Sequence, residues 1–323
     1  DKVIVADFNG NVVENPKTYT VDWDASAAEK GGWDSFMDKE IHEDPAAVQR
    51  TLLGRFDTNG GITLDEVRID EHDFKAIDKI IVVACGTASY AGQVAKYAIE
   101  HWVRIPVEIE LAHEFRYRDP ILTPRTLVVA ISQSGETMDT LMALRHAREQ
   151  GSKVLAICNT QGASIPRESD AVLYTHAGPE VAVASTKAFV AQITAAYLLG
   201  LYLAQVKGAM FRDEIHQVLD SLKDMPRKIQ WVLDTQPKTI QAAAERMVNA
   251  NSFLFLGRHV GYPVALEGAL KLKEIAYTFT EGFAAGELKH GPIALVDEGE
   301  PVVFIVPPQR GRNVLQDRKS TRL

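Results

Sequence analysis

Residues 125–137 read RTLVVAISQSGET, and this stretch indicates the fold. The run from Thr126 to Ile131 is apolar without alternation, which is typical of a strand buried on both faces of a sheet. A polar loop from Ser132 to Thr137 follows the run, and a helical pattern begins directly after it. This succession predicts a parallel α/β sheet that is covered by helices on both sides.

Further apolar runs alternate with helical patterns on both sides of this stretch. KIIVVACG (79–86) precedes a helical segment, and VEIEL, KVLAICN and AVLYTH supply the other expected strands. We therefore expect a doubly wound parallel sheet in a first α/β domain at 76–210. Connecting helices are expected at 211–237 and a second domain at 238–323.

The chain contains two copies of one α/β unit. The segment EFRY (114–117) matches ELKH (287–290) at an offset of 173 residues, and each is followed by a strand, RTLVVAIS and EPVVFIVP respectively. Gly86 after IIVVAC matches Gly257 after FLFL, at an offset of 171 residues. The chain ends before a full second copy would, so we expect the second sheet to be truncated, with an open edge.

Composition excludes several classes of protein. The 323 residues suit about two domains. The net charge of −8 disfavours non-specific binding to nucleic acid or to a membrane surface. Cys85 and Cys158 predict no disulfide framework and a cytoplasmic location. Residues 189–206 just reach the ~18 that a membrane span needs, but polar side chains such as Gln192 favour a helix buried between domains or subunits.

The loop after the central strand has the features of an anion site. Hydroxyl groups, a glycine and the free amides of a helix N-terminus together suit a phosphate group. Gly86-Thr87 occupies the matching place after the 79–84 run, and strand ends beside a switch point converge on one crevice. We expect one ligand to be bound by both loops, through Thr87, Ser132, Gln133, Ser134 and Thr137. The alternative is an ordinary N-cap at Ser134 or Thr137.

Charged residues further along the chain are candidates for acid–base chemistry. Glu267, Lys271 and Glu274 are spaced to share one stripe of a helix. A carboxylate beside an ammonium group suits a general base, although a solvated salt-bridge ladder has the same pattern. His290 lies in a Gly/Pro-flanked loop, where it either titrates near neutrality for catalysis or is merely exposed. No spacing predicts a metal site, and no cofactor is expected.

These motifs together resemble one family. ACGT, SQSGET, VASTKAF, ALEGALKLKE and GELKHGP, in this order and spacing, resemble the isomerase half of glutamine-dependent fructose-6-phosphate aminotransferases (glucosamine-6-phosphate synthases). The resemblance runs from about Ala27 to Pro307 and implies two tandem sugar-isomerase (SIS, flavodoxin-like) domains. Residues 1–26 resemble the tail of a glutaminase domain whose nucleophilic cysteine the chain lacks, and 27–75 resemble a linker with helices.

The resemblance places the substrate contacts on two loops. Val183 and Ser185 match positions that contact the sugar. In the same loop, Ser185-Thr186 is the expected cap of the helix that follows. Ala88 stands where many members have a second phosphate-binding serine, so we expect Ser89 to replace that hydrogen bond or the bond to be missing. The phosphate loop of the family corresponds to Ser132, Gln133, Ser134 and Thr137, with Thr87.

The resemblance also assigns catalytic roles. Glu274 matches the base that moves a proton between C1 and C2 of the sugar, with Lys271 and Glu267 as companions. His290 matches the ring-opening histidine, which serves the neighbouring subunit and so implies a homodimer. Phe279 departs from the histidine that is usual there, and the chain ends before the tail lysine that forms a Schiff base.

The implied reaction converts fructose 6-phosphate and glutamine-derived ammonia to glucosamine 6-phosphate, the ammonia coming from a glutaminase domain. We expect the chain alone to bind the sugar phosphate weakly at best and not to turn over glutamine. One alternative is an SIS-domain deglycase of sugar-phosphate adducts, which the linker and the glutaminase-like start disfavour. Another is a non-catalytic sugar-phosphate sensor, which the lack of a basic helix-turn-helix pattern disfavours.

Overall fold

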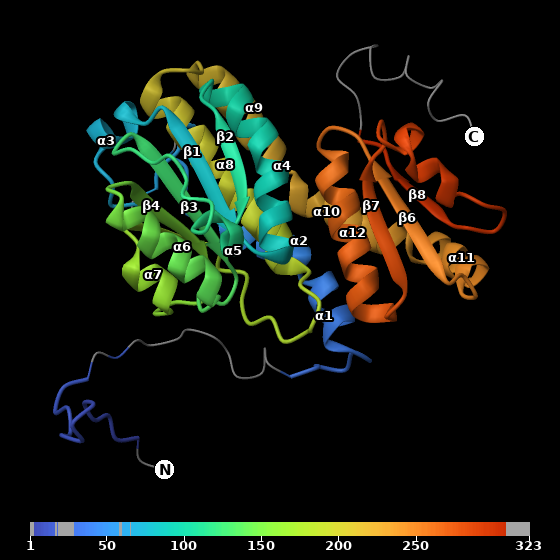
Figure 1. Cartoon of the computed structure of the whole chain (residues 1–323), viewed down its shortest axis with the longest axis horizontal. Coiled ribbons are helices and arrows are strands. Elements are labelled where there is room, and N and C mark those ends of the chain that lie inside the picture. The colour runs from blue at the N-terminus through green and yellow to red at the C-terminus, as the bar shows by residue number, and fades with distance from the viewer. Residues whose placement is uncertain (1–2, 17, 19–28, 58–59, 65, 308–323) are drawn as a thin grey trace.

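The computed structural model describes residues 3–16, 18, 29–57, 60–64 and 66–307. Within these residues, two α/β bodies lie side by side (Figure 1). They are preceded by α1 (Phe36–His42) and α2 (Asp44–Leu52), which form where the sequence was helical in pattern. Ser35 caps α1 with its side chain, and Asp44-Pro45 begins the next helix.

The first body contains a five-stranded sheet whose strands are all parallel. The strand order is β2-β1-β3-β4-β5, which is the flavodoxin-like doubly wound order. The order reverses between β1 and β3, so a crevice is expected at the carboxyl ends of these two strands. The strands are β1 (Lys79–Ala84), β2 (Val107–Leu111), β3 (Thr126–Ser132), β4 (Lys153–Cys158) and β5 (Ala171–Tyr174).

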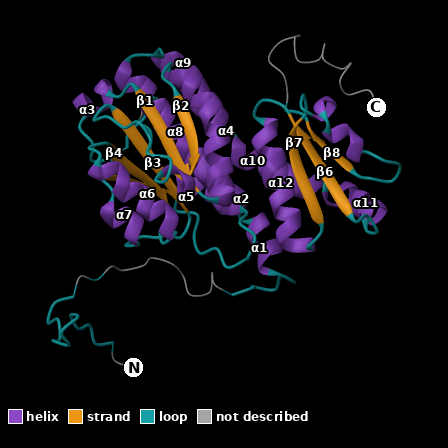
Figure 2. Cartoon of the chain, in the orientation of Figure 1, coloured by secondary structure: helices purple, strands orange, loops and turns teal. Residues whose placement is uncertain are grey.

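Helices cover both faces of this sheet (Figure 2). Alternate residues of β1 enter two separate cores: Ile80 and Val82 pack in one, and Ile81 and Val83 in the other. This explains why the strands are apolar without alternation. The first core includes α3 (Glu71–Ala76), α4 (Gly86–Val103) and α8 (Lys187–Lys207); the second includes α5 (Ala112–Phe115), α6 (Met138–Glu149) and α7 (Ser164–Glu168).

Helix α8 is long and apolar enough to cross a membrane, with a mean hydropathy of 1.5 over an 18-residue window. However, 61% of that window is buried inside the fold. It packs against α2, α3 and α4, and Leu198 and Leu199 lie in the core. The expectation of a buried helix is confirmed, but α8 is covered by the first domain and the helices before it, not by a second domain.

The second body repeats part of the first. Its three parallel strands have the order β7-β6-β8, which corresponds to β2-β1-β3. Two tandem sheets of one topology are therefore present, whereas the exact domain limits stay a prediction. Two connecting helices, α9 (Arg212–Lys223) and α10 (Met225–Thr235), pack on the first body, and Ile215, Leu219 and Leu222 of α9 lie in its core. The elements of the second body are α11 (Pro237–Met247), β6 (Ser252–Gly257), α12 (Gly261–Ala276), β7 (Phe279–Ala284), η2 (Leu288–His290), η3 (Pro292–Leu295) and β8 (Val302–Ile305). Helix α12 packs on α4 and so joins the two bodies.

Candidate functional site

A pocket lies at the carboxyl ends of β1 and β3, where the strand order reverses. It brings together side chains from three loops that are far apart in the sequence. The loops after β1 and β3 meet as expected, and the loop before α8 contributes one more residue. The expected residues that line it are Thr87, Ser132, Gln133, Ser134, Thr137 and Ser185.

The hydroxyl groups of the β3 loop order the loop itself. The Ser132 hydroxyl accepts from the Gly135 amide at 3.0 Å and lies 3.1 Å from the Thr137 hydroxyl. The Ser134 hydroxyl accepts from the Glu136 amide at 3.2 Å. Thr137 occupies the N-cap position of α6, but its side chain makes no capping bond. The ordinary N-cap therefore does not describe this loop, and the helix N-terminus faces the pocket as an anion site would.

Gly135 is required by the tight packing behind this loop. Its φ is +68°, and a Cβ there would lie 2.6 Å from the Ala163 Cβ and 2.8 Å from the Cys158 sulfur. Burial raises the pKa of the Cys158 thiol to about 12, so this thiol is inert. Cys85 lines the pocket and is half-buried. Both cysteines are free, as the sequence predicted.

The charged residues of α12 form one cluster. Lys271 Nζ lies 3.4 Å from Glu267 Oε1 and 2.7 Å from Glu274 Oε2. The side chains of Glu267 and Lys271 are 7% and 17% exposed, so the cluster is not a solvated ladder. Burial raises the pKa of Glu267 to about 7, against the opposing effect of Lys271 and of a hydrogen bond from Thr87. A carboxyl group with such a pKa can hold or release a proton near neutrality.

Thr87 connects the α12 cluster to the pocket. Its hydroxyl donates to Glu267 Oε1 at 3.0 Å and accepts from Lys271 Nζ at 3.0 Å. The same residue lines the pocket beside Ser134. We call residues 132–137, the loop after β3, the anion loop. The pocket that this loop lines and the charged cluster of α12 thus meet within one chain, through Thr87 at the start of α4.

Other expected residues lie elsewhere. Val183 is 94% exposed and does not line the pocket. His290 lies in η2 at an exposed position outside the pocket, and its backbone amide donates to the Glu287 carbonyl at 2.8 Å. Ser89 is buried outside the pocket and its hydroxyl has no hydrogen-bond partner, which favours the other expected outcome, that the hydrogen bond at position 88 is missing. Nothing in the structure explains Phe279, which is 64% exposed at the start of β7.

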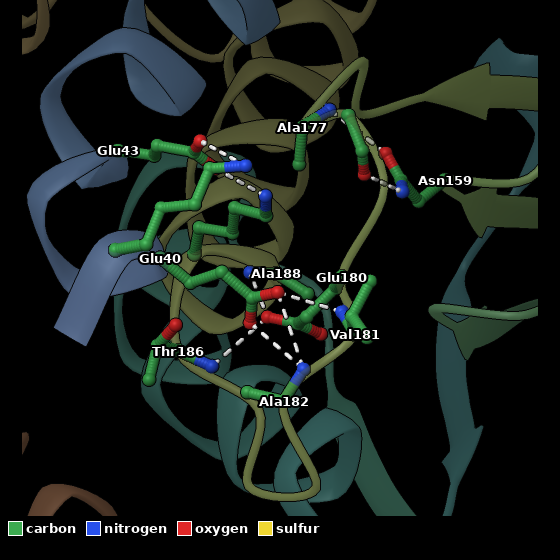
Figure 3. A network of polar contacts seen from close by, with 12 residues as sticks. Glu40, Glu43, Asn159, Ala177, Glu180, Val181, Ala182, Thr186 and Ala188 are labelled. Atoms are coloured by element: carbon green, nitrogen blue, oxygen red, sulfur yellow. Dashed lines mark hydrogen bonds and ion pairs between the residues drawn. The ribbon is translucent and has the colours of Figure 1, made fainter. Parts of the chain in front are cut away.

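Two residues in this region were not predicted to belong to the site. Gln192 lines the pocket at 2% exposure, and its carboxamide oxygen is buried without a hydrogen-bond partner. A glutamine in an otherwise apolar helix was the available signal. Glu180 caps α8: its carboxylate accepts from the amides of Thr186 and Ala188 at 2.9 and 3.1 Å (Figure 3). The expected cap by Ser185-Thr186 is therefore wrong.

Metal binding has no support in the described part of the chain, where no group of three His, Cys, Asp or Glu side chains could hold an ion. The polar lining of the pocket instead offers hydroxyl, amide and carboxamide groups. Such groups bind an anionic or hydroxylated ligand by hydrogen bonds.

Comparison with known sequences gives a consistent picture. The profile of the SIS domain matches residues 74–202 and 246–319. The glutamine–fructose-6-phosphate aminotransferase (isomerizing) of Corynebacterium diphtheriae is 69% identical over 96% of the chain, and that of Streptomyces coelicolor is 64% identical over 98%. The chain spans about half the length of these curated relatives, 50% and 51% respectively.

Solved structures agree with these matches. The C-terminal domain of glucosamine-fructose-6-phosphate aminotransferase from Francisella tularensis has a TM-score of 0.86 and 40% identity, covering 91% of this chain and 82% of that one. Tagatose-6-phosphate ketose/aldose isomerase from Escherichia coli has a TM-score of 0.65 and 18% identity, covering 88% of this chain and 75% of that one. At 18% identity, the similarity to the Escherichia coli enzyme is evidence for a shared fold only.

Proposed function

The chain belongs to the SIS domain family, and we propose that it is the part of a glutamine–fructose-6-phosphate aminotransferase that binds fructose 6-phosphate and isomerises it. The observation that carries this proposal is the double hydrogen bond of Thr87. It joins a pocket suited to a phosphate with a buried carboxylate–ammonium cluster. A sugar phosphate anchored at the first would present its carbon chain to the second.

Each part of the site has a role in this proposal. The N-terminus of α6 and the hydroxyl of Ser134 hold the phosphate, and Thr87, whose hydroxyl proton is donated to Glu267, lines the pocket beside them. Glu274 takes a proton from C1 of the bound ketose and returns it at C2, while the ion pair with Lys271 holds this carboxylate in place. Glu267 lies 3.4 Å from the Lys271 ammonium group and accepts a hydrogen bond from Thr87, so it holds Thr87 next to Lys271.

The rest of the reaction depends on groups beyond this pocket. In the whole protein, ammonia derived from glutamine supplies the nitrogen of glucosamine 6-phosphate. His290, which does not line the pocket of its own chain, would open the sugar ring in the pocket of a second copy, so we propose a homodimer. A cytoplasmic enzyme that needs no metal or cofactor is part of the same proposal.

Calorimetric titration of the chain tests the binding step. Fructose 6-phosphate and inorganic phosphate should bind, and fructose should not. Ser134→Ala should lower the affinity for fructose 6-phosphate about tenfold, because it removes a hydroxyl group next to the phosphate. Ser221→Ala, at an exposed position on α9, is the matched control. Fructose binding as tightly as its phosphate would contradict the proposal.

A second experiment tests the chemical step in a protein that has the full length of the relatives. Glu274→Gln should keep the affinity for fructose 6-phosphate within about twofold and lower turnover at least about a hundredfold. Unchanged turnover would exclude Glu274 as the base. Retained binding with no turnover in the unaltered protein would instead favour a sugar-phosphate sensor.

A further inference from the structure

The loop that carries Ser185 is held by side chains from outside the first domain. Residues 175–186 connect β5 to α8. Thr51 of α2 donates to the carbonyl of Thr175 at 2.6 Å. Arg50, also of α2, donates to the carbonyls of the next two residues at 2.9 Å each. The segment before the first domain therefore fixes the beginning of this loop.

Glu40 of α1 fixes the middle of the loop. Its side chain is buried, with the whole residue 2% exposed. One carboxylate oxygen accepts from the amides of Val181 and Ala182 at 2.6 and 3.2 Å, and the other lies 3.3 Å from the Ala182 amide. Figure 3 shows this carboxylate pointing at the two amides. Hydrogen bonds from buried amides to a carboxylate are strong, so they restrict this turn.

Glu180 extends this contact to the pocket. It directly precedes Val181 in the chain, and its carboxylate accepts from the Ser185 hydroxyl at 3.1 Å. The same carboxylate caps α8. Lys187, the first residue of α8, is buried and forms an ion pair with Glu43 at the end of α1. The position of Ser185 thus depends on a chain of contacts that begins at α1.

Asn159 ties the same loop to the phosphate end of the pocket. Its amide nitrogen donates to the Gly178 carbonyl at 2.7 Å, and its oxygen accepts from the Ala177 amide at 2.8 Å. Its backbone amide donates to the Gln133 carbonyl at 3.2 Å. The loop is therefore fastened to the anion loop on one side and to α1 on the other.

We propose that Glu40 is a positioning residue, which sets the sugar end of the pocket through Val181, Glu180 and Ser185 and leaves the phosphate end unaffected. The proposal rests on the proposed function for the identity of the ligand. Glu40 lies before residue 74, where the match to the SIS domain begins. The selectivity of this pocket for a whole sugar phosphate over bare phosphate is thus set by a helix outside the SIS domains.

Paired titrations with fructose 6-phosphate and inorganic phosphate test this role. Glu40→Gln keeps the shape but replaces one accepting oxygen by a donor that faces the Ala182 amide. This variant should have an affinity for fructose 6-phosphate about tenfold lower, and its affinity for phosphate should change by less than about twofold. Glu71→Gln, at an exposed position on α3, is the control and should change neither. Glu40→Asp keeps the charge with a shorter reach and replaces Glu40→Gln if that variant does not fold.

The ratio of the two affinities decides the inference, because general damage to the fold would weaken both ligands. Equal weakening, or no weakening of fructose 6-phosphate, overturns the proposal. If the unaltered chain does not bind fructose 6-phosphate, the proposed function fails, and amide hydrogen exchange then tests Glu40 by itself. Glu40→Gln should speed exchange at Val181 and Ala182 at least about tenfold, and unchanged exchange there would overturn the inference.

Discussion

In the first domain, the turn after the leading strand leaves open space, whereas in the second domain the corresponding turn is closed by main chain. A Cβ added to Gly86 would meet nothing within 4 Å. One added to Gly257 would lie 1.9 Å from the Gly261 carbonyl oxygen, and one on Gly261 would lie 2.7 Å from that of Ile305. The repeated unit thus keeps its strand order in both copies, but the backbone is packed far more closely around the turn in the second copy than in the first.

The two copies also differ in how they are covered. All seven residues of β3 are buried, but none of its counterpart β8 is. Strand order depends on parallel pairing and on the crossover connections, whereas burial of a strand needs helices on both faces. The second domain contributes to the site through the side chains along α12, and the first through the loops at its strand ends. The same fold unit therefore contributes strand-end loops to the site in one copy and a helix face in the other.

Glycine substitutions give the largest expected effect. Gly257→Ala should lower the free energy of unfolding by about 3 kcal/mol or more, because its Cβ would overlap backbone atoms that cannot move aside. Gly86→Ala should lower the free energy of unfolding by only about 1 kcal/mol, because an alanine is strained at the φ of +53° found there. Denaturant unfolding of both variants measures the difference. Equal losses would show that the two turns are alike.

The next largest effect concerns the charge in α12. The pKa of Glu267 is raised to about 7 from 4.5, so between these pH values the native state holds a proton that the unfolded state has released. This contribution to stability is complete below pH 4.5 and is lost as the pH rises through 7, by up to about 3 kcal/mol. Glu267→Gln should remove this pH dependence. The free energy of unfolding of the variant, relative to that of the unaltered protein, should therefore be higher at pH 7.5 than at pH 5. Unfolding at both pH values checks this, and a constant difference would contradict it.

A smaller effect, with opposite signs for stability and binding, is expected at Gln192. Gln192→Leu removes a buried oxygen that has no partner, so the empty chain should gain about 1 kcal/mol in its free energy of unfolding. The affinity for fructose 6-phosphate should nevertheless fall about tenfold, because the ligand loses a hydrogen bond. Thermal unfolding and calorimetric titration provide the two measurements. A loss of both stability and affinity would mean that the carboxamide is structural.

His290 should give the smallest effect. His290→Ala should change the free energy of unfolding by less than about 0.5 kcal/mol, since the residue is exposed. In the single chain, the affinity for fructose 6-phosphate should change less than twofold. A larger loss of affinity would place His290 in this chain's own pocket and remove the main reason for a shared site between two copies.

Much of this arrangement follows from local patterns. Continuous apolar runs predict strands buried on both faces, and the helical spacing of Glu267, Lys271 and Glu274 predicts their shared stripe. The convergence of Thr87 with Ser134 follows from the rule for ligand sites at a switch point in the strand order. These features depend on the geometry of one strand, one helix or one connection.

Other features depend on contacts between distant segments, which no local pattern contains. Glu40 and Glu180 are ordinary helix and loop carboxylates in the sequence, and their role comes from where α1 docks. The cap of α8 was misassigned because a carboxylate seven residues before the helix replaces the expected hydroxyl. The contact between Thr87 and α12 likewise needs the packing of the two bodies against each other.

The burial of Cys158 behind Gly135 has a practical consequence. In the folded chain, a thiol reagent will react with Cys85 alone, because the other thiol is inaccessible and holds its proton. Cys85 lines the pocket, so its labelling rate with a small maleimide becomes a footprint of occupancy. Ligands can then be ranked by how strongly they slow that reaction, in the unmodified sequence and without a spectroscopic tag.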